Sequence, residues 1–374
     1  MAYLRTTSKA QVGGLERIKG FPLILTEDYR VNWLALHFIF YLFKRSSVSS
    51  VKTYAVHLTD FYSQLEVGNL DVFDVDDDWL SAYKKYLVHR DGSGPENTQN
   101  YASQVIRTVV IYCAWLTKQG FSDTLCGEGC NYRVKINEGR KGGVKHFLIK
   151  NENSDVRSIS APWSQWIETI KIYGPKREDL ARRFELMIDW GRLAGLRAHE
   201  ICHLKIWQLP DKKSAFKSLE NKRKIKIKLF VTKGGEDGSV YVPPLLVTKT
   251  WEYVDIYRRD VIRRHKKIKK SKREAYLEPE YIFLSNATGK HVTPKGLSNA
   301  VRKAFLAAVE NEKLTADERV WLHGLRHNFI SLGFKVADEL KVRNPENYVR
   351  QSSRHKSVDS LTGYSSGRHD EGFS

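Results

Sequence analysis

The sequence predicts a mainly α-helical fold with one small antiparallel β-sheet, divided between two domains. Apolar residues recur at three- and four-residue spacing through much of the chain, which is the pattern of amphipathic helices. Near residues 224–229 apolar and charged residues alternate with a period of two, which indicates a half-buried strand. At 374 residues the chain is too long for one ordinary core, so two domains and a connecting segment are expected.

The first part of the chain is expected to form a small helical bundle. Residues 1–24 are basic and polar, and we expect a mobile N-terminal arm there. Residues 25–121 show helical periodicity four times, with aspartates opening the third segment and a Gly- and Pro-containing break before the fourth. The four expected helices cover residues 28–44, 48–66, 76–90 and 96–119.

Residues 122–157 lack periodicity and are rich in Gly, Lys and Arg, so we expect an extended linker. Its cations Arg140, Lys141 and Lys145 are candidates for contact with a phosphate backbone, and a solvated tether without contacts is the alternative.

Residues 158–374 are expected to form the second domain. A helix at 177–193 leads directly to Arg197, and strands at 224–229 and 240–242 form a hairpin with Lys233 near its tip. Further helices are expected at residues 245–271, 294–311, 323–334, 345–353 and 357–364.

The charge balance implies a polyanionic partner. There are 62 Lys and Arg residues against 43 Asp and Glu, a net charge of +19, and duplex DNA carries a phosphate charge about every 1.7 Å along its axis. No apolar stretch approaches the roughly 20 residues of a membrane-spanning helix, and no signal region opens the chain. We therefore expect a cytoplasmic protein, associated with the nucleoid when bound to DNA.

Four cysteines are too few and too scattered for a disulfide scaffold. Cys126 and Cys130 could form half of a zinc site, but no second pair follows, so reduced thiols are favoured.

An ordered set of polar residues indicates phosphodiester chemistry. His323 and Arg326 are separated by three residues and therefore leave the same face of a helix. His355 and Tyr364 follow, and Arg197 lies upstream. Arginines can hold phosphate oxygens with paired hydrogen bonds, and a tyrosine hydroxyl can attack phosphorus once a base accepts its proton. Singly, each residue could equally be a helix-end arginine, a hairpin lysine or a core aromatic; their joint order favours a site.

In this order and spacing the residues resemble the tyrosine recombinase (phage integrase) family. The resemblance is strong over roughly the last 200 residues and general before residue 125. It implies an N-terminal helical core-binding domain that clamps duplex DNA and a C-terminal tyrosine-recombinase catalytic domain. The catalytic residues that it implies are Arg197, Lys233, His323, Arg326, His355 and Tyr364.

The resemblance also implies a role for each residue. Tyr364 would be the nucleophile that forms a 3′-phosphotyrosine, His323 its proton acceptor, and Lys233 the acid that protonates the leaving oxygen. His355 would hydrogen-bond the phosphate, and Glu200 would orient Arg197, although a surface charge is the alternative for Glu200. Because the arginines take the place of metal ions, no cofactor is expected. The flanking residues His199, His203 and His327 are assigned structural roles.

Nine residues separate His355 from Tyr364, so one continuous helix would point them to opposite sides. We expect a break at Gly363 or within 357–360.

Two further features concern DNA contact. The basic run that starts at residue 258 is expected to touch DNA, with a solvated helix face as the alternative. The candidate contacts in this run are Arg258, Arg259, Arg263, Arg264, Lys266 and Lys267. The family usually has glycine before the second histidine, where this chain has Arg354. That arginine either adds a phosphate contact or distorts the turn.

The resemblance implies a site-specific recombinase that acts as a homotetramer on double-stranded DNA recombination sites, through a Holliday junction. It would integrate or excise a mobile element or phage, with accessory DNA-bending or directionality factors as candidate partners. A type IB topoisomerase or telomere resolvase would use the same chemistry. A catalytically inactive DNA-binding regulator on this fold is a further alternative, and an RNA-binding protein is a weaker one because no aromatic single-strand platform is evident.

Overall fold

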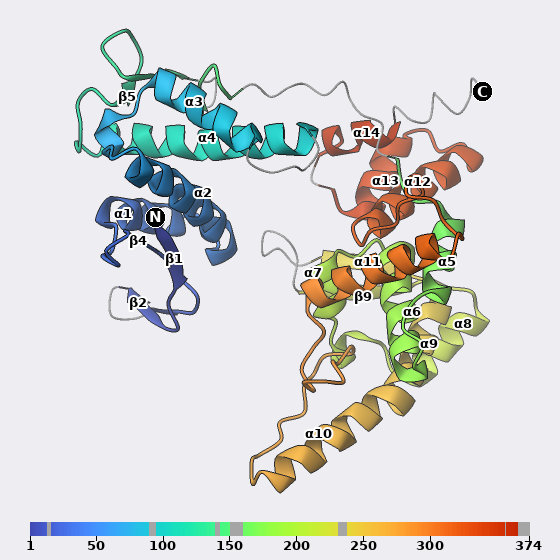
Figure 1. The fold of residues 1–374 in the computed structure, drawn as a ribbon. Helices are drawn as coiled ribbons and strands as arrows, with labels where there is room; N and C mark the ends of the chain where they lie inside the picture. The colour runs from blue at the N-terminus through green and yellow to red at the C-terminus, as the bar shows by residue number, and fades with distance from the viewer. Residues whose placement is uncertain are drawn as a thin grey trace. The chain divides into compact units, whose positions relative to one another are not determined.

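The computed structural model of the chain describes residues 1–12, 16–89, 95–138, 143–149, 160–230, 238–355 and 357–365. The chain divides into two compact units, Met1–Ser154 and Asp155–Ser374, and each is described by itself (Figure 1). None of the helices in the described ranges has both the length and the apolar character that crossing a membrane requires.

The first unit opens with two small antiparallel sheets, and four helices follow in its described part. Strand β1 (Tyr3–Thr6) pairs with β4 (Pro22–Leu25), and β2 (Ala10–Val12) pairs with β3 (Glu16–Ile18). The helices and the 3₁₀ turn between the second and third of them are α1 (Trp33–Phe43), α2 (Val48–Val67), η1 (Val72–Asp74), α3 (Asp77–His89) and α4 (Pro95–Lys118). The four α-helices lie where the periodicity predicted them.

Side-chain caps fix where these helices begin. The Asn32 side chain accepts a hydrogen bond from the Ala35 N–H at 2.9 Å, and Asp76 accepts one from the Trp79 N–H at 2.8 Å. Each cap satisfies a backbone donor that the first turn of a helix leaves without a partner.

The expected mobile arm at residues 1–24 is wrong. Phe21 and Ile24 are each only 1% exposed, and the Phe21 ring stacks on Phe40 with ring centroids 4.6 Å apart. The sheet of β1 and β4 packs on α2, and its buried residue Ile24 faces the bundle. Such buried residues are too few and too unevenly spaced to give a periodic signal.

The expected extended linker is also wrong over its described part, residues 122–138 and 143–149. Strand β5 (Cys126–Gly127) pairs in parallel with β6 (Val134–Lys135), and β7 (Asn137–Glu138) pairs with β8 (Val144–Lys145). Leu125 and Val134 are fully buried in the core of the first unit. Isolated apolar residues in a Gly-rich stretch therefore hold it against the bundle, without forming a long element.

The second unit is mainly helical, with one antiparallel hairpin in its described part. Its helices, in chain order, are α5 (Ser164–Ile172), α6 (Glu178–Leu193), α7 (Ala198–Cys202), α8 (Lys212–Glu220), α9 (Pro244–Tyr253), α10 (Arg259–Ser271), α11 (Pro294–Glu310), α12 (Gly324–Glu339), α13 (Pro345–Ser353) and α14 (Thr362–Ser365). Two 3₁₀ turns, η2 (Ile206–Gln208) and η4 (Asp359–Leu361), and a π-helical turn, η3 (Val254–Arg258), complete it. Strand β9 (Ile225–Leu229) pairs with β10 (Gly238–Val242), and β9 shows the predicted alternation of buried and exposed residues.

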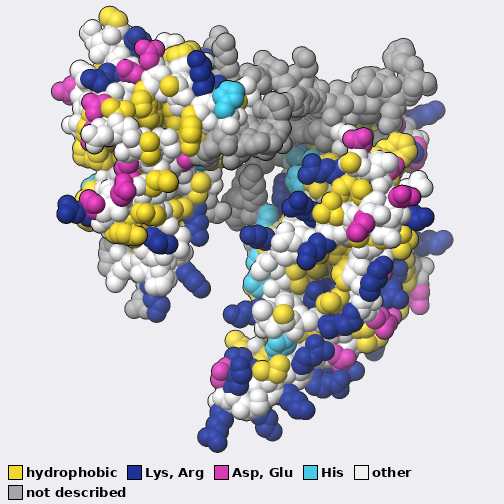
Figure 2. Space-filling view, viewed as in Figure 1, with side chains coloured by type: hydrophobic (Ala, Val, Ile, Leu, Met, Phe, Trp, Pro, Cys, Tyr) yellow, Lys and Arg dark blue, Asp and Glu magenta, His cyan; other side chains and the backbone are white. Residues whose placement is uncertain are grey.

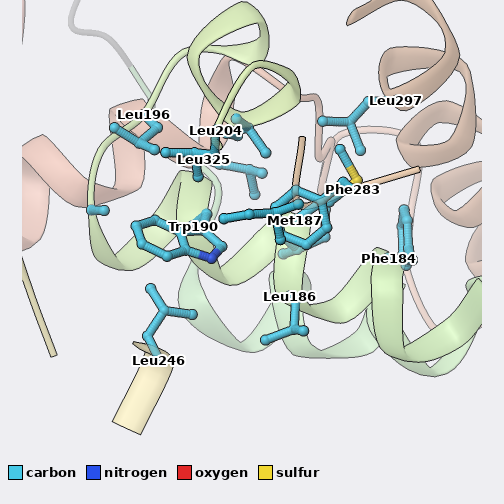
Figure 3. Packing of buried hydrophobic residues seen from close by; sticks show 14 of the residues in the cluster. Phe184, Leu186, Met187, Trp190, Leu196, Leu204, Leu246, Phe283, Leu297 and Leu325 are labelled. Carbon is cyan, nitrogen blue, oxygen red and sulfur yellow. The ribbon is translucent and has the colours of Figure 1, made fainter. Parts of the chain in front are cut away.

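Helix α6 lies at the centre of this unit and contacts both α9 and α12. Trp190 on α6 is fully buried, and its indole Nε1 donates to the Thr250 hydroxyl at 3.1 Å. Figure 3 shows Trp190 with Leu196 and Leu325 on one side and Leu246 on the other. Because α6 ends just before Arg197 and α12 carries Arg326, this core fixes the positions of both arginines.

We predict that Phe21→Ala destabilises the first unit by about 3–5 kcal/mol, the usual cost of truncating a buried phenylalanine. The reason is that Phe21 is buried against Phe40, where a mobile arm would leave it in solvent. Hydrogen exchange of peptides from α1 and α2 in the full chain, measured by mass spectrometry, would report the loss. Phe147→Ala is the control, because Phe147 is 57% exposed. Equal protection of these amides from exchange in both variants would contradict the packing of the N-terminal segment on the helices.

Candidate active site

Arg197 and Glu200 lie together at the start of α7. The Glu200 carboxylate accepts the backbone N–H of Arg197 at 2.8 Å and a guanidinium N–H of the same residue, Nη1, at 3.2 Å. The turn before them needs Gly195, since its φ is +60° and a Cβ there would lie 2.5 Å from the Phe329 ring. The short helix thus presents Arg197 from a rigid turn. Glu200 contacts both the backbone and the side chain of Arg197, and the orienting role that the family resemblance implied stays a prediction.

Arg326 on α12 is 2% exposed and joins two distant loops. Its Nη1 donates to the carbonyl of Gly195 and its Nη2 to the carbonyl of Ser353. Burial, then the charges of Arg197 and Arg354, lower the pKa of Arg326 to about 9, so the guanidinium stays charged at neutral pH. One buried cation therefore brings the segments that carry Arg197 and His355 to the same place.

His355 follows directly after the end of α13. Its Nδ1 lies 2.6 Å from the hydroxyl of Ser353, which in turn donates to the carbonyl of Val349 at 2.6 Å. Between His355 and Tyr364 the helix is broken, because Ser357 and Val358 are not helical and the 3₁₀ turn η4 precedes α14. The break therefore falls within 357–360, one of the two expected places, whereas Gly363 lies inside α14. Arg354, one residue before His355, ends α13 with a left-handed backbone, with φ 58° and ψ 42°.

Tyr364 is 8% exposed and packs in a small apolar cluster. The other buried members are Ile330, Phe334, Val349 and Leu361. Its hydroxyl is hydrogen-bonded to Nδ1 of His327. Burial raises the pKa of Tyr364 to about 12, while the charge of Arg326 acts in the opposite direction.

His327 is thus a site residue that sequence reasoning missed. It was assigned a structural role, because a histidine directly after the H-x-x-R motif gives no signal of its own. Its contact with Tyr364 depends on the position of α14, which the sequence does not specify. The His323 ring lies 4.7 Å from the His327 ring between centroids, in an edge-to-face arrangement. His323 itself is exposed at the start of α12.

Burial keeps two imidazoles in the neutral form. Desolvation, then the nearby charges of His323 and Arg326, lowers the pKa of His327 to about 4. Desolvation, with Arg326 and Arg197 next in order, lowers the pKa of His355 to about 4 as well. A neutral imidazole beside Tyr364 can accept a proton at neutral pH.

The described residues therefore place Arg197, Glu200, Arg326, His355 and Tyr364 in one cluster, and His323 borders it. Lys233 lies outside the described residues, although β9 and β10 on either side of it form the predicted hairpin.

Arg354 belongs to the cluster, but as an internal ion-pair partner and not as an exposed cation. It donates to both carboxylate oxygens of Glu200, from Nη1 to Oε1 at 3.0 Å and from Nη2 to Oε2 at 2.8 Å. Burial alone would raise the pKa of Glu200, but the hydrogen bonds and charge of Arg354, together with Arg197, hold it below its usual value. The expectation of a direct DNA contact by Arg354 is therefore corrected.

Arg258 is a second correction. It is 3% exposed, and its guanidinium donates to the Tyr281 carbonyl at 2.8 Å, to Glu278 at 3.0 Å and to the Pro279 carbonyl. It holds the segment after α10 against the domain and is closed to DNA. The sequence placed it among exposed cations because burial depends on its position in the π-helical turn, η3.

The other candidate cations of the basic run are exposed. Figure 2 shows Lys and Arg side chains gathered over α10, which Figure 1 shows running out from the rest of the second unit. The exposed candidates on this helix are Arg259, Arg263, Arg264, Lys266 and Lys267. In the first unit Lys145 is exposed on β8, and Arg140 and Lys141 lie outside the described residues.

Solved structures share this fold at low sequence identity. A crystal structure of XerH site-specific recombinase bound to difH substrate matches with 15% identity and a TM-score of 0.53, covering 85% of this chain and 77% of that chain. A lambda integrase dimer bound to a COC′ core site matches with 13% identity and a TM-score of 0.54, covering 89% and 94%. The Tn1549 transposon integrase in complex with transposon right end DNA matches with 14% identity and a TM-score of 0.50, covering 90% and 97%.

No protein-family model matches the sequence, and no curated protein matches it. The structural likeness establishes the fold: the chain shares the mainly α fold of these recombinase and integrase structures, and its described part has small two-stranded sheets. The fold class inferred from the sequence is confirmed.

We predict that the chain becomes less stable as the pH falls from about 6.5 towards 4. The folded-state pKa values of His327 and His355 are both about 4, below the ordinary value of 6.5, so the unfolded chain binds more protons in this window. Stability from these neutral imidazoles is present above the window and lost as the pH falls through it. Urea unfolding on both sides of the window would measure the change.

His327→Gln and His355→Gln should each flatten this pH dependence, because glutamine does not titrate. His37→Gln is the control, since His37 is exposed on α1. An unchanged pH dependence in both site variants would mean that the two imidazoles are not held neutral.

Proposed function

We propose that the chain is a site-specific DNA recombinase or integrase that cleaves and rejoins DNA strands through a 3′-phosphotyrosine intermediate. One observation carries the proposal: the buried Tyr364 hydroxyl is hydrogen-bonded to a neutral imidazole beside the buried guanidinium of Arg326. The solved structures with this fold support it, since XerH, lambda integrase and the Tn1549 integrase are described as complexes with DNA.

In this mechanism Arg197 and Arg326 bind the non-bridging oxygens of the scissile phosphate. A guanidinium has five N–H donors, and Arg326 uses two of them on the carbonyls of Gly195 and Ser353. The remaining donors suit an oxyanion whose charge grows in the transition state. His355 is held through Ser353 at Nδ1, and the negative charge of a bound phosphate would favour its protonated form, which can donate a further hydrogen bond from Nε2.

The nucleophile must lose a proton, because a phenol with a pKa of about 12 is almost entirely protonated at neutral pH. His327 is within hydrogen-bond reach and neutral, so we assign it as the first acceptor. His323, the acceptor expected from the sequence, lies next to His327 and would pass the proton to solvent. Lys233 on the hairpin would protonate the leaving 5′ oxygen.

The proposed substrates are double-stranded DNA recombination sites, and the proposed assembly is a homotetramer that exchanges strands through a Holliday junction. Its role would be the integration or excision of a mobile element, aided by accessory DNA-bending or directionality factors. Helix α10 would add contacts to the phosphate backbone, because Arg259, Arg263, Lys266 and Lys270 are all exposed and recur at helical spacing along one face.

We predict that Tyr364→Phe abolishes the covalent adduct with a nicked suicide substrate, while DNA affinity changes little. The phenyl ring preserves packing in the apolar cluster and removes only the attacking oxygen. Denaturing gel electrophoresis of reactions run in excess EDTA would show the adduct. Adduct formation by the variant would assign the nucleophile to another residue, and loss of wild-type adduct in EDTA that Mg²⁺ restores would overturn the arginine mechanism.

A second prediction concerns α10. Binding of DNA becomes weaker as salt rises, and the steepness of this fall counts the phosphate contacts. Replacement by Gln of four cations should make the plot of log binding constant against log salt concentration less steep, by up to about 0.9 for each lost contact. The four are Arg259, Arg263, Lys266 and Lys270. DNA affinity should fall at low salt, whereas the cleavage rate of bound substrate should not. Fluorescence anisotropy over a range of salt concentrations would measure the slope.

The matched control removes four exposed cations on and after α11, namely Lys295, Arg302, Lys303 and Lys313. It changes the net charge by the same amount. If the salt dependence of DNA binding became equally less steep in both variants, net charge, and not contact by α10, would explain the effect.

A further inference from the structure

The side chain of Arg354 connects two parts of the site that are far apart in sequence. Arg354 ends α13 in a left-handed backbone conformation, which residues other than glycine rarely adopt. The next residue is His355. The Arg354 side chain returns to α7 and there meets Glu200, which lies 154 positions earlier in the chain. A strained backbone at this point is therefore accompanied by a specific long-range ion pair.

The ion pair occupies both oxygens of a fully buried carboxylate. The side chain of Glu200 is 0% exposed and that of Arg354 is 13% exposed. The two parallel contacts, at 3.0 and 2.8 Å, have the bidentate geometry in which arginine binds carboxylates most strongly. The side chain of Arg197 makes only one contact with the same carboxylate, at 3.2 Å, and remains 24% exposed.

A buried carboxylate must be neutralised, and two guanidinium groups compete for this one. If Arg354 were absent, the nearest cation able to pair with Glu200 would be Arg197. Its guanidinium would then close onto the carboxylate in bidentate fashion, and fewer of its donors would point into the site. Arg354 thereby leaves the donors of Arg197 available.

Direct contact of Arg354 with a DNA phosphate does not fit the geometry. One N–H of each terminal nitrogen pairs with Glu200, Nε is closed to solvent, and the side chain is only 13% exposed, so Glu200 is the main partner of the guanidinium. Arg354 acts through other residues.

We propose that Arg354 is a positioning residue that occupies Glu200, keeps the Arg197 guanidinium free to bind an oxyanion, and fixes His355 relative to Arg197. The oxyanion is the scissile phosphate, so this part rests on the proposed function. The competition between the two arginines for Glu200 does not depend on it.

The test uses Arg354→Gly in the full chain, because glycine accepts the left-handed backbone and removes the guanidinium. The first readout is independent of catalysis: labelling of Arg197 by phenylglyoxal, followed by mass spectrometry of its peptide. Labelling should slow several-fold in Arg354→Gly, because Arg197 becomes paired with Glu200. Unchanged labelling would overturn the proposal, whether or not the chain is a recombinase.

The second readout is single-turnover cleavage of a suicide substrate. Arg354→Gly should be slower by about 10²-fold, the typical effect of a misplacement of about 1 Å near reacting groups. Added methylguanidinium should bind beside Glu200 and restore part of the rate in a saturable way. A wild-type rate in the variant, or a slow variant that methylguanidinium does not rescue, would contradict a positioning role. A wild-type chain that forms no adduct would overturn the proposed function alone.

Lys341→Gly is the matched control. Lys341 also has a left-handed backbone, with φ 51°, just after α12, and its side chain is exposed. This variant removes the same backbone strain and one positive charge. It should label Arg197 and cleave DNA as the wild type does, with no response to methylguanidinium.

Discussion

The candidate site depends on the burial of one arginine. A guanidinium enclosed in protein is tolerated only if acceptors replace the water that it loses, and Arg326 finds them in the carbonyls of Gly195 and Ser353. These carbonyls belong to segments 131 and 27 residues away from Arg326. Arg197 follows Gly195 by two positions, and His355 follows Ser353 by two positions. Satisfying one buried charge therefore assembles the phosphate-binding groups.

Charge balance around Glu200 is the second constraint. One buried carboxylate lies among Arg197, Arg326 and Arg354, so the cluster retains net positive charge even after pairing. That excess, together with burial, lowers the pKa of the neighbouring imidazoles and keeps them neutral. Burial raises the pKa of Tyr364, and the positive charge of Arg326 opposes this rise. A site of this kind attracts an anion and provides a proton acceptor in the same small volume.

The packing of α14 decides which base meets the tyrosine. Tyr364 is anchored by apolar contacts with α12 and α13 residues, so its hydroxyl is directed to His327 and not to the exposed His323. The non-helical stretch before η4 makes this approach possible, because one continuous helix from His355 would carry Tyr364 to the opposite side. The packing of one short helix thus determines which of two histidines, four residues apart, meets the tyrosine.

The sequence by itself predicted the four helices of the first unit, α6, most of the later helices of the second unit and the β9–β10 hairpin, because periodicity is a local property. It did not predict α7 or α8, and it extended the last helix back to residue 357, where the structure has η4 and the short α14. It also supplied the ordered set from Arg197 to Tyr364, because motif spacing is local too. It failed for the described parts of residues 1–24 and 122–149, where isolated apolar residues such as Phe21 and Val134 reach a core without any repeating pattern. The sequence also placed Arg258 and Arg354 among the candidate DNA contacts, although both guanidinium groups pair with acceptors inside the protein. Only the tertiary structure could decide these, since the burial of a charge depends on acceptors that the fold brings from distant positions. The same reason applies to His327, whose contact exists only once α14 packs against α12.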